Sequence, residues 1–176
     1  MTNTTEHSDY IPIIRRNGLF LYWIDGDGPR FARLFAETWR QLPLWARRRI
    51  LRYWRETHPR TSNDTLVEVE PPWPHIELLA DKSDFHWRGN SKDAMAQTVK
   101  GKLFAFKSSV MDTMPDAEVL FTIAHELAHA FYFAGDDIEE HFSDPEWADI
   151  EADELADLWG FDRDDGTVLP ATLPVV

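Results

Sequence analysis

The chain has 176 residues, 43% hydrophobic and 28% charged, which suits one globular domain and excludes a disordered chain. It holds no cysteine, so a disulfide scaffold, a thiolate metal site and a cysteine nucleophile are excluded. The net charge of −13 is uneven: residues 1–60 carry 11 Lys/Arg and 6 Asp/Glu, whereas residues 108–176 carry one and 18. So acidic a C-terminal part repels phosphates, and nucleic acid is therefore not an expected partner.

Neither a secretory signal nor a membrane span is visible. Residues 1–10 are polar, and no apolar run approaches the roughly 20 residues that a bilayer requires. We therefore expect a cytoplasmic protein that does not bind membranes. One domain is expected over residues 1–176, with flexible ends at 1–9 and 162–176, and the sequence does not specify an oligomeric state.

The apolar pattern predicts a hairpin, two helices, three short strands and two further helices, in that order. The dipeptide Asn17-Gly18 predicts the hairpin turn, and residues 81–98 are predicted to be a long loop. The other elements are expected near residues 11–24 (hairpin), 30–41 and 44–56 (helices), 65–70, 76–80 and 102–110 (strands), and 116–134 and 145–160 (helices). This order predicts an α+β domain with a short, mostly antiparallel sheet packed against helices.

The sequence His125-Glu126-Leu127-Ala128-His129 is an H-E-x-x-H motif inside a predicted helix. Residues four apart on a helix share one face, so the imidazoles of His125 and His129 can bind one metal ion. Glu126 is turned by about 100°, so its carboxylate can take a proton from a water on the metal. Without cysteine ligands, Zn²⁺ is the expected cofactor. The alternative is a pair of core histidines that hydrogen bonds satisfy.

A third metal ligand must come from elsewhere in the chain. The acidic loop after the motif offers His141, Asp136 and Asp137. The last predicted helix offers Glu151 as first choice and Glu154 as second. Glu154 could instead orient a ligand histidine.

Glu151 is preferred because of its place on the helix. Steps of about 100° per residue place it between Leu155 and Leu158, inside the apolar arc. A carboxylate aimed into a core requires a partner, and a metal ion held by two histidines is one. The remaining acids of the helix fall on the opposite, solvated side: Asp149, Asp153 and Asp157.

The run Ala124-His125-Glu126-Leu127-Ala128-His129-Ala130, followed by Glu151-Ala152-Asp153, resembles the zincin superfamily of the gluzincin type. In that type, as in thermolysin, a glutamate on a following helix completes the H-E-x-x-H site. The two runs further resemble the small bacterial and phage ImmA/IrrE-like metallopeptidases, over about residues 100–161. The resemblance implies a zinc metallopeptidase of the endopeptidase class, with His125, His129 and Glu151 as metal ligands and Glu126 as general base.

The same resemblance implies that a strand beside the active-site helix, here Leu103–Val110, pairs with an extended protein or peptide substrate. It also implies an oxyanion stabiliser, for which His141 and Tyr132 are the candidates. Two other functions stay open. One is a zincin-fold regulatory or binding protein with little or no turnover, against which the intact Glu126 argues. The other is a structural zinc site, which normally has four protein ligands.

Overall fold

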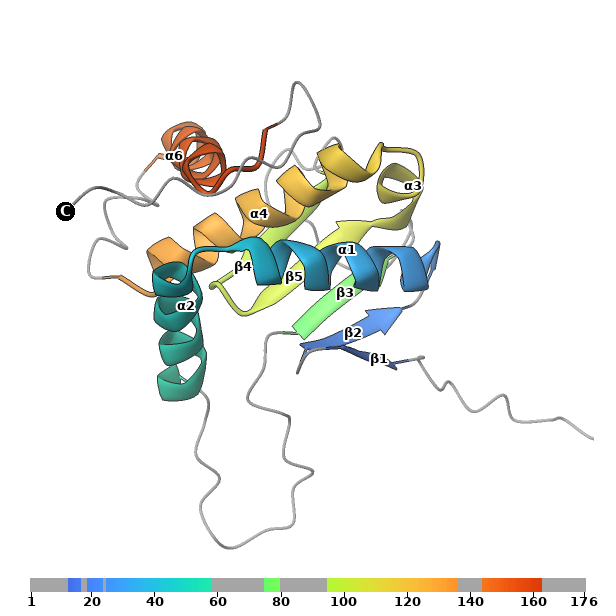
Figure 1. Cartoon of the computed structure of the whole chain (residues 1–176), viewed down its shortest axis with the longest axis horizontal. Coiled ribbons are helices and arrows are strands. Elements are labelled where there is room, and N and C mark those ends of the chain that lie inside the picture. Colours follow the sequence, from blue (N-terminus) through green and yellow to red (C-terminus); the bar gives the residue numbers. More distant parts are fainter. Residues whose placement is uncertain are drawn as a thin grey trace, which may run out of the picture.

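The structure, a computed structural model, contains a five-stranded sheet with helices packed on it (Figure 1). It describes residues 13–16, 19–23, 25–57, 75–79, 95–135 and 144–162. The strands are β1 (Ile13–Arg16), β2 (Leu19–Trp23), β3 (His75–Leu79), β4 (Ala96–Val99) and β5 (Leu103–Lys107). The helices are α1 (Gly28–Gln41), α2 (Leu44–Thr57), α3 (Ser108–Met111), α4 (Asp116–Phe133) and α6 (Pro145–Leu158). The α+β class is confirmed, and no described helix is long and apolar enough to cross a membrane.

The sheet is mixed, so the prediction of a mostly antiparallel sheet is wrong. Its strand order is β1-β2-β3-β5-β4. The outer pairs β1–β2 and β4–β5 are antiparallel, whereas β2–β3 and β3–β5 are parallel. A parallel pair requires a long crossover connection, and α1 and α2 provide it between β2 and β3.

The edge of the sheet beside α4 differs from the expected one. Strand β5 lies inside the sheet, between β3 and β4, and residues 108–111 form helix α3. The expectation that Leu103–Val110 forms the substrate-pairing edge is therefore wrong. Among the described strands the edge strand is β4, which begins inside the predicted loop of residues 81–98 and ends one residue beyond it. The predicted strand at residues 65–70 lies outside the described residues.

Helices α1 and α4 cover the same face of the sheet and contact each other (Figure 1). On this face the ring of Phe31 in α1 lies 4.8 Å from that of Phe106 in β5. The side chain of Thr98 shares the face, because Thr98 pairs with Phe104, and it bonds Glu126 in α4. Helix α4, which carries the motif, thus lies beside α1 on this face.

The turn between β4 and β5 is held by both neighbouring helices. Lys100 and Gly101 have positive φ values of 51° and 62°. Tyr53 in α2 donates a hydrogen bond to the Lys100 carbonyl (2.8 Å), and Trp54 Nε1 donates to the Gly101 carbonyl (2.7 Å). A Cβ at Gly101 would lie 2.9 Å from Phe133 Cβ in α4, so glycine allows this close approach. These contacts fix the position of the edge strand relative to α4.

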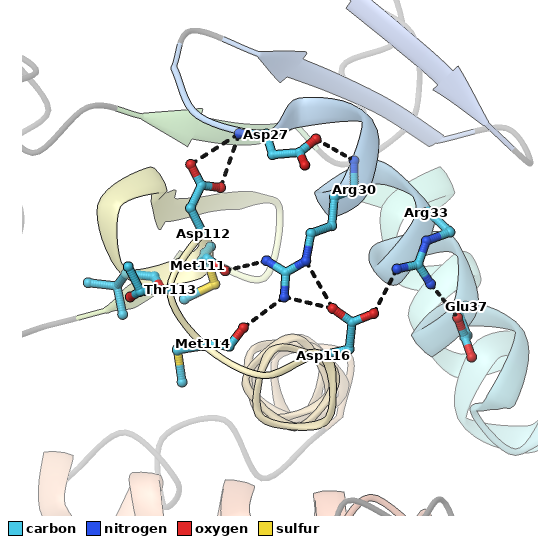
Figure 2. A network of polar contacts seen from close by, with 10 residues as sticks. Asp27, Arg30, Arg33, Glu37, Met111, Asp112, Thr113, Met114 and Asp116 are labelled. Atoms are coloured by element: carbon cyan, nitrogen blue, oxygen red, sulfur yellow. Dashed lines mark hydrogen bonds and ion pairs between the residues drawn. The ribbon is translucent and has the colours of Figure 1, made fainter.

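A polar network fixes the start of α4 against α1 (Figure 2). The Arg30 guanidinium donates to the carbonyls of Met111 (2.6 Å) and Met114 (2.7 Å) and to the Asp116 carboxylate. Arg33 donates to the other Asp116 oxygen at 2.7 Å. The hydrogen bonds from Arg33 and Arg30 lower the pKa of Asp116 below its ordinary value. The helix that carries the H-E-x-x-H motif is thus anchored at its first residue.

Candidate metal centre

The two histidines of the motif meet on one face of α4. His125 and His129 lie one turn apart, and their Nε2 atoms are 3.1 Å from each other. His129 is buried, and His125 is half-buried. The neighbouring Ala124 and Ala128 are fully buried in the core. The helix is therefore held firmly by its apolar sides while both imidazole rings point to one place.

Helix α6 lies across α4, and Figure 1 shows it nearly end-on while α4 runs across the view. It begins at Asp144, whose side chain accepts a hydrogen bond from the Glu146 backbone N–H (2.9 Å). Its buried side is made largely of small residues, which let two helices approach closely. These are Ala148, Ala152 and Ala156. The crossing brings one flank of α6 to the imidazoles.

Asp149 on that flank provides a third possible ligand atom. Its Oδ1 lies 3.4 Å from His129 Nε2 and 3.8 Å from His125 Nε2. A tetrahedral zinc ion with ligands at about 2.0–2.1 Å keeps neighbouring ligand atoms roughly 3.3 Å apart. Within the described part of the chain, these three residues form a group that could hold a metal ion. Their spacing fits one ion, and the Asp149 side chain, 70% exposed, leaves the group open to solvent.

Asp153, one turn after Asp149, contacts the other nitrogen of His125. Its Oδ1 lies 2.7 Å from His125 Nδ1. A carboxylate accepts the Nδ1 proton, so this contact favours the tautomer whose Nε2 lone pair is free to bind a metal. A hydrogen bond of this kind also fixes the orientation of the ring. Asp149 and Asp153 therefore act on the histidines from the same flank of α6.

Glu126 is buried, with 5% of its surface exposed. Thr98 in the edge strand β4 donates a hydrogen bond to its Oε2, and the same hydroxyl lies 3.2 Å from the Glu126 backbone carbonyl. A buried carboxylate requires such a donor. The carboxylate keeps a second oxygen with which to accept a proton.

Glu151, the predicted third ligand, lies on the opposite flank of α6 from Asp149. Two residues along a helix correspond to a turn of about 200°. Burial raises the pKa of Tyr132, and the charges of Glu151 and Glu154 raise it further, while Arg49 opposes them. Glu151 thus lies close enough to Tyr132 to affect its charge, and it is not part of the group formed by the histidines and Asp149. Its role as a ligand stays a prediction.

The helix-face argument for Glu151 placed the buried arc of α6 wrongly. Trp147 and Leu158, expected at its edge, are 53% and 51% exposed. Leu155 is buried as expected, and Ala148, Ala152 and Ala156 form the rest of the buried side, where small residues allow a close approach to α4. The arc is consequently displaced, and Asp149 and Glu151 fall at its two borders.

The remaining candidates are not brought to the centre by the described structure. Three of them lie outside the described residues: His141, Asp136 and Asp137. Tyr132 is half-buried on α4, and its role as an oxyanion donor stays a prediction. Glu154 is exposed.

The sequence placed Asp149 and Asp153 on the solvated side of the last helix and made no prediction for Thr98, yet all three residues contact the motif. For the two aspartates a signal existed, because they repeat on α6 the four-residue spacing that the histidines have on α4. For Thr98 there was none, since it falls within a stretch whose polarity predicted a loop.

Comparisons with known proteins give no match to any family model, curated protein or solved structure.

Proposed function

We propose that this protein is a zinc-dependent metallopeptidase, with His125, His129 and Asp149 as zinc ligands and Glu126 as general base. The convergence of the three ligand atoms, at 3.1, 3.4 and 3.8 Å from one another, is the observation that carries the proposal. The zincin-like arrangement implied by the resemblance is supported by an H-E-x-x-H helix lying next to an edge strand.

Zinc in this group would lower the pKa of a coordinated water to about 7 and polarise the carbonyl of a peptide bond. Glu126 takes a proton from the water that attacks the carbonyl carbon and delivers it to the departing amine nitrogen. Asp153 accepts a hydrogen bond from the Nδ1–H of His125, so that Nε2 stays directed at the metal.

The ligand set favours a catalytic site over a structural one. A structural zinc ion usually has four protein ligands, whereas a catalytic ion keeps one position for water. Among the described residues the group has three members, and the exposed Asp149 opens it to solvent. The substrate class is an extended peptide, which the edge strand β4 can bind through its backbone.

Zinc content tests the ligand assignment. We expect about one zinc per chain in the purified protein, because three convergent ligands hold one ion. Asp149→Asn should weaken zinc binding about tenfold or more, as loss of a charged ligand does, whereas Glu151→Gln should leave it unchanged. Zinc affinity is measured by competition with a chromogenic chelator.

The two variants remove the same charge from opposite flanks of one helix, so each is the control for the other. The reverse result would restore Glu151 as the ligand. A wild-type protein that takes up no zinc would contradict the proposed function.

Hydrolysis tests the role of the base. Glu126→Gln should retain zinc and lose about 100-fold or more of the activity on fluorescein-labelled casein, because a general base contributes this much. Equal casein hydrolysis by the two zinc-loaded proteins would contradict the mechanism. A zinc-loaded wild type with no activity on casein or on a peptide library would favour the binding protein.

A further inference from the structure

Thr98 links the edge strand to the proposed base. Its hydroxyl is the hydrogen-bond donor that the described residues bring to the Glu126 carboxylate, and this carboxylate is buried. The hydroxyl has a single proton, and its closer acceptor is Oε2 rather than the backbone carbonyl at 3.2 Å. The bond is therefore primarily a bond to the side chain that performs the proposed chemistry.

The backbone N–H and C=O of the same residue point to the side of β4 on which no other described strand lies. In an antiparallel pair, hydrogen-bonded residue pairs alternate with pairs that are not bonded to each other. The Lys107 N–H donates to the Met95 carbonyl (2.9 Å), so the pair formed by Gln97 and Ala105 is also of the bonded kind. It follows that the N–H and C=O of Thr98 point away from β5, toward the edge.

We propose that Thr98 is a positioning residue that orients Glu126 and couples this orientation to the binding of a peptide along β4. A peptide that pairs with the edge strand would bond the backbone of Thr98 and thereby fix the strand. The fixed hydroxyl holds Oε2 of Glu126, so that its other oxygen faces the attacking water. The inference rests on the proposed function. It adds that Thr98 links the binding of a peptide along β4 to the orientation of Glu126.

A purely structural role would give a different result. The hydroxyl could serve only to tie β4 to α4 through the Glu126 backbone carbonyl. In that case its loss would lower stability without changing what the Glu126 side chain does. A measurement that depends on the position of the Glu126 carboxylate therefore distinguishes the positioning role of Thr98 from a purely structural role.

The experiment uses the full chain loaded with Co²⁺, whose visible spectrum reports binding of acetohydroxamate. This small chelator binds the metal and shares a proton with a neighbouring carboxylate, so its affinity depends on where Glu126 lies. Thr98→Val should weaken acetohydroxamate binding about tenfold, as loss of a hydrogen bond to a charged group does, and Thr98→Ser should restore it. The double variant Thr98→Val, Glu126→Gln should bind no more weakly than Glu126→Gln alone.

Thr122→Val is the matched control. Thr122 is buried, whereas Thr98 is half-buried, and its hydroxyl also donates to a backbone carbonyl of α4, that of Glu118 (2.8 Å), but not to the Glu126 carboxylate. We expect its affinity for acetohydroxamate to equal that of the wild type. In the casein assay, kcat should fall for Thr98→Val and stay at the wild-type value for Thr122→Val. Zinc affinity should be unchanged in both of these variants.

The outcomes separate the two proposals. If the wild type binds metal and acetohydroxamate but Thr98→Val behaves like Thr122→Val, the positioning role is wrong and the proposed function stands. Additive losses in the double variant would likewise overturn the positioning role, because they would show that Thr98 acts independently of Glu126. A wild type that binds no metal would overturn both proposals.

Discussion

Asp149 and Asp153 are neighbours on one flank of α6 but have different parts in the proposed site. Asp149 offers an oxygen to the metal, whereas Asp153 bonds the far nitrogen of His125 at 2.7 Å. A group of the second kind stabilises the metal indirectly, because it holds the ligand ring in place and raises its basicity. Both contributions can be measured separately.

Asp153→Asn should lower zinc affinity about 10-fold to 100-fold without removing a ligand. The physical reason is that an amide is a weaker acceptor for the Nδ1 proton than a carboxylate. Zinc affinity is again measured by chelator competition. Asp157→Asn, which removes the same charge one turn further along α6, is the control. Equal losses in the two variants would show that the general negative charge, and not the bond to His125, stabilises the metal.

At the scale of elements, the junction between α1 and α4 depends on a single carboxylate. The Asp116 carboxylate forms an ion pair with the Arg33 guanidinium and another with that of Arg30, each at 2.7 Å. These arginines lower the pKa of Asp116. A lowered pKa in the folded state means that the ionised carboxylate stabilises the fold. The contribution is complete above the unfolded pKa of about 3.9 and is lost as the pH falls through the lower folded pKa.

We therefore expect Asp116→Asn to reduce the free energy of unfolding at pH 7. The side chain is about half exposed, so solvent screening limits the loss to about 1 kcal/mol. The difference from the wild type should shrink as the pH falls below about 3.9 and vanish below the lowered folded pKa of Asp116, where both side chains are neutral. Urea unfolding across this range measures it. Glu118→Gln, in the same helical turn, is the control for the helix dipole, and a loss as large in that variant would contradict the role of the two arginines.

Positive and negative charges are concentrated in different parts of the molecule. Helix α2 carries five arginines and one glutamate, whereas α6 carries six acids and no basic residue. Residues 108–176, which include both helices of the proposed site, have one Lys/Arg and 18 Asp/Glu. A bound zinc ion would offset only its own two charges. The field at the site is therefore strongly negative.

We expect this field to favour peptides with basic or neutral residues over acidic ones, because it raises the local concentration of cations. The preference should weaken with added salt, since the screening length is about 8 Å near physiological ionic strength. Digestion of a peptide library at low and high salt measures it. Cleavage sites enriched in Asp and Glu, or a preference indifferent to salt, would show that the acids lie on outer faces and serve solubility alone.

The sequence by itself determined the elements whose signals are local. The 3.6-residue repeat predicted α1, α2, α4 and α6, and Asn17-Gly18 predicted the turn between β1 and β2. The meeting of His125 and His129 was also determined locally, because both lie on one helix and their separation follows from helical geometry alone. These features require no knowledge of what packs against them.

Only the tertiary structure decided which flank of α6 faces the imidazoles. The helical wheel of a single helix does not contain the crossing with α4. Leu155 is buried as expected, but the buried side continues through Ala148 and Ala156 and leaves Trp147 and Leu158 exposed. The edge position of β4 and the parallel pairs of the sheet were decided in the same way. Pairing partners are chosen by contacts distant in sequence, so a four-residue strand such as β4 has no local signal of its own.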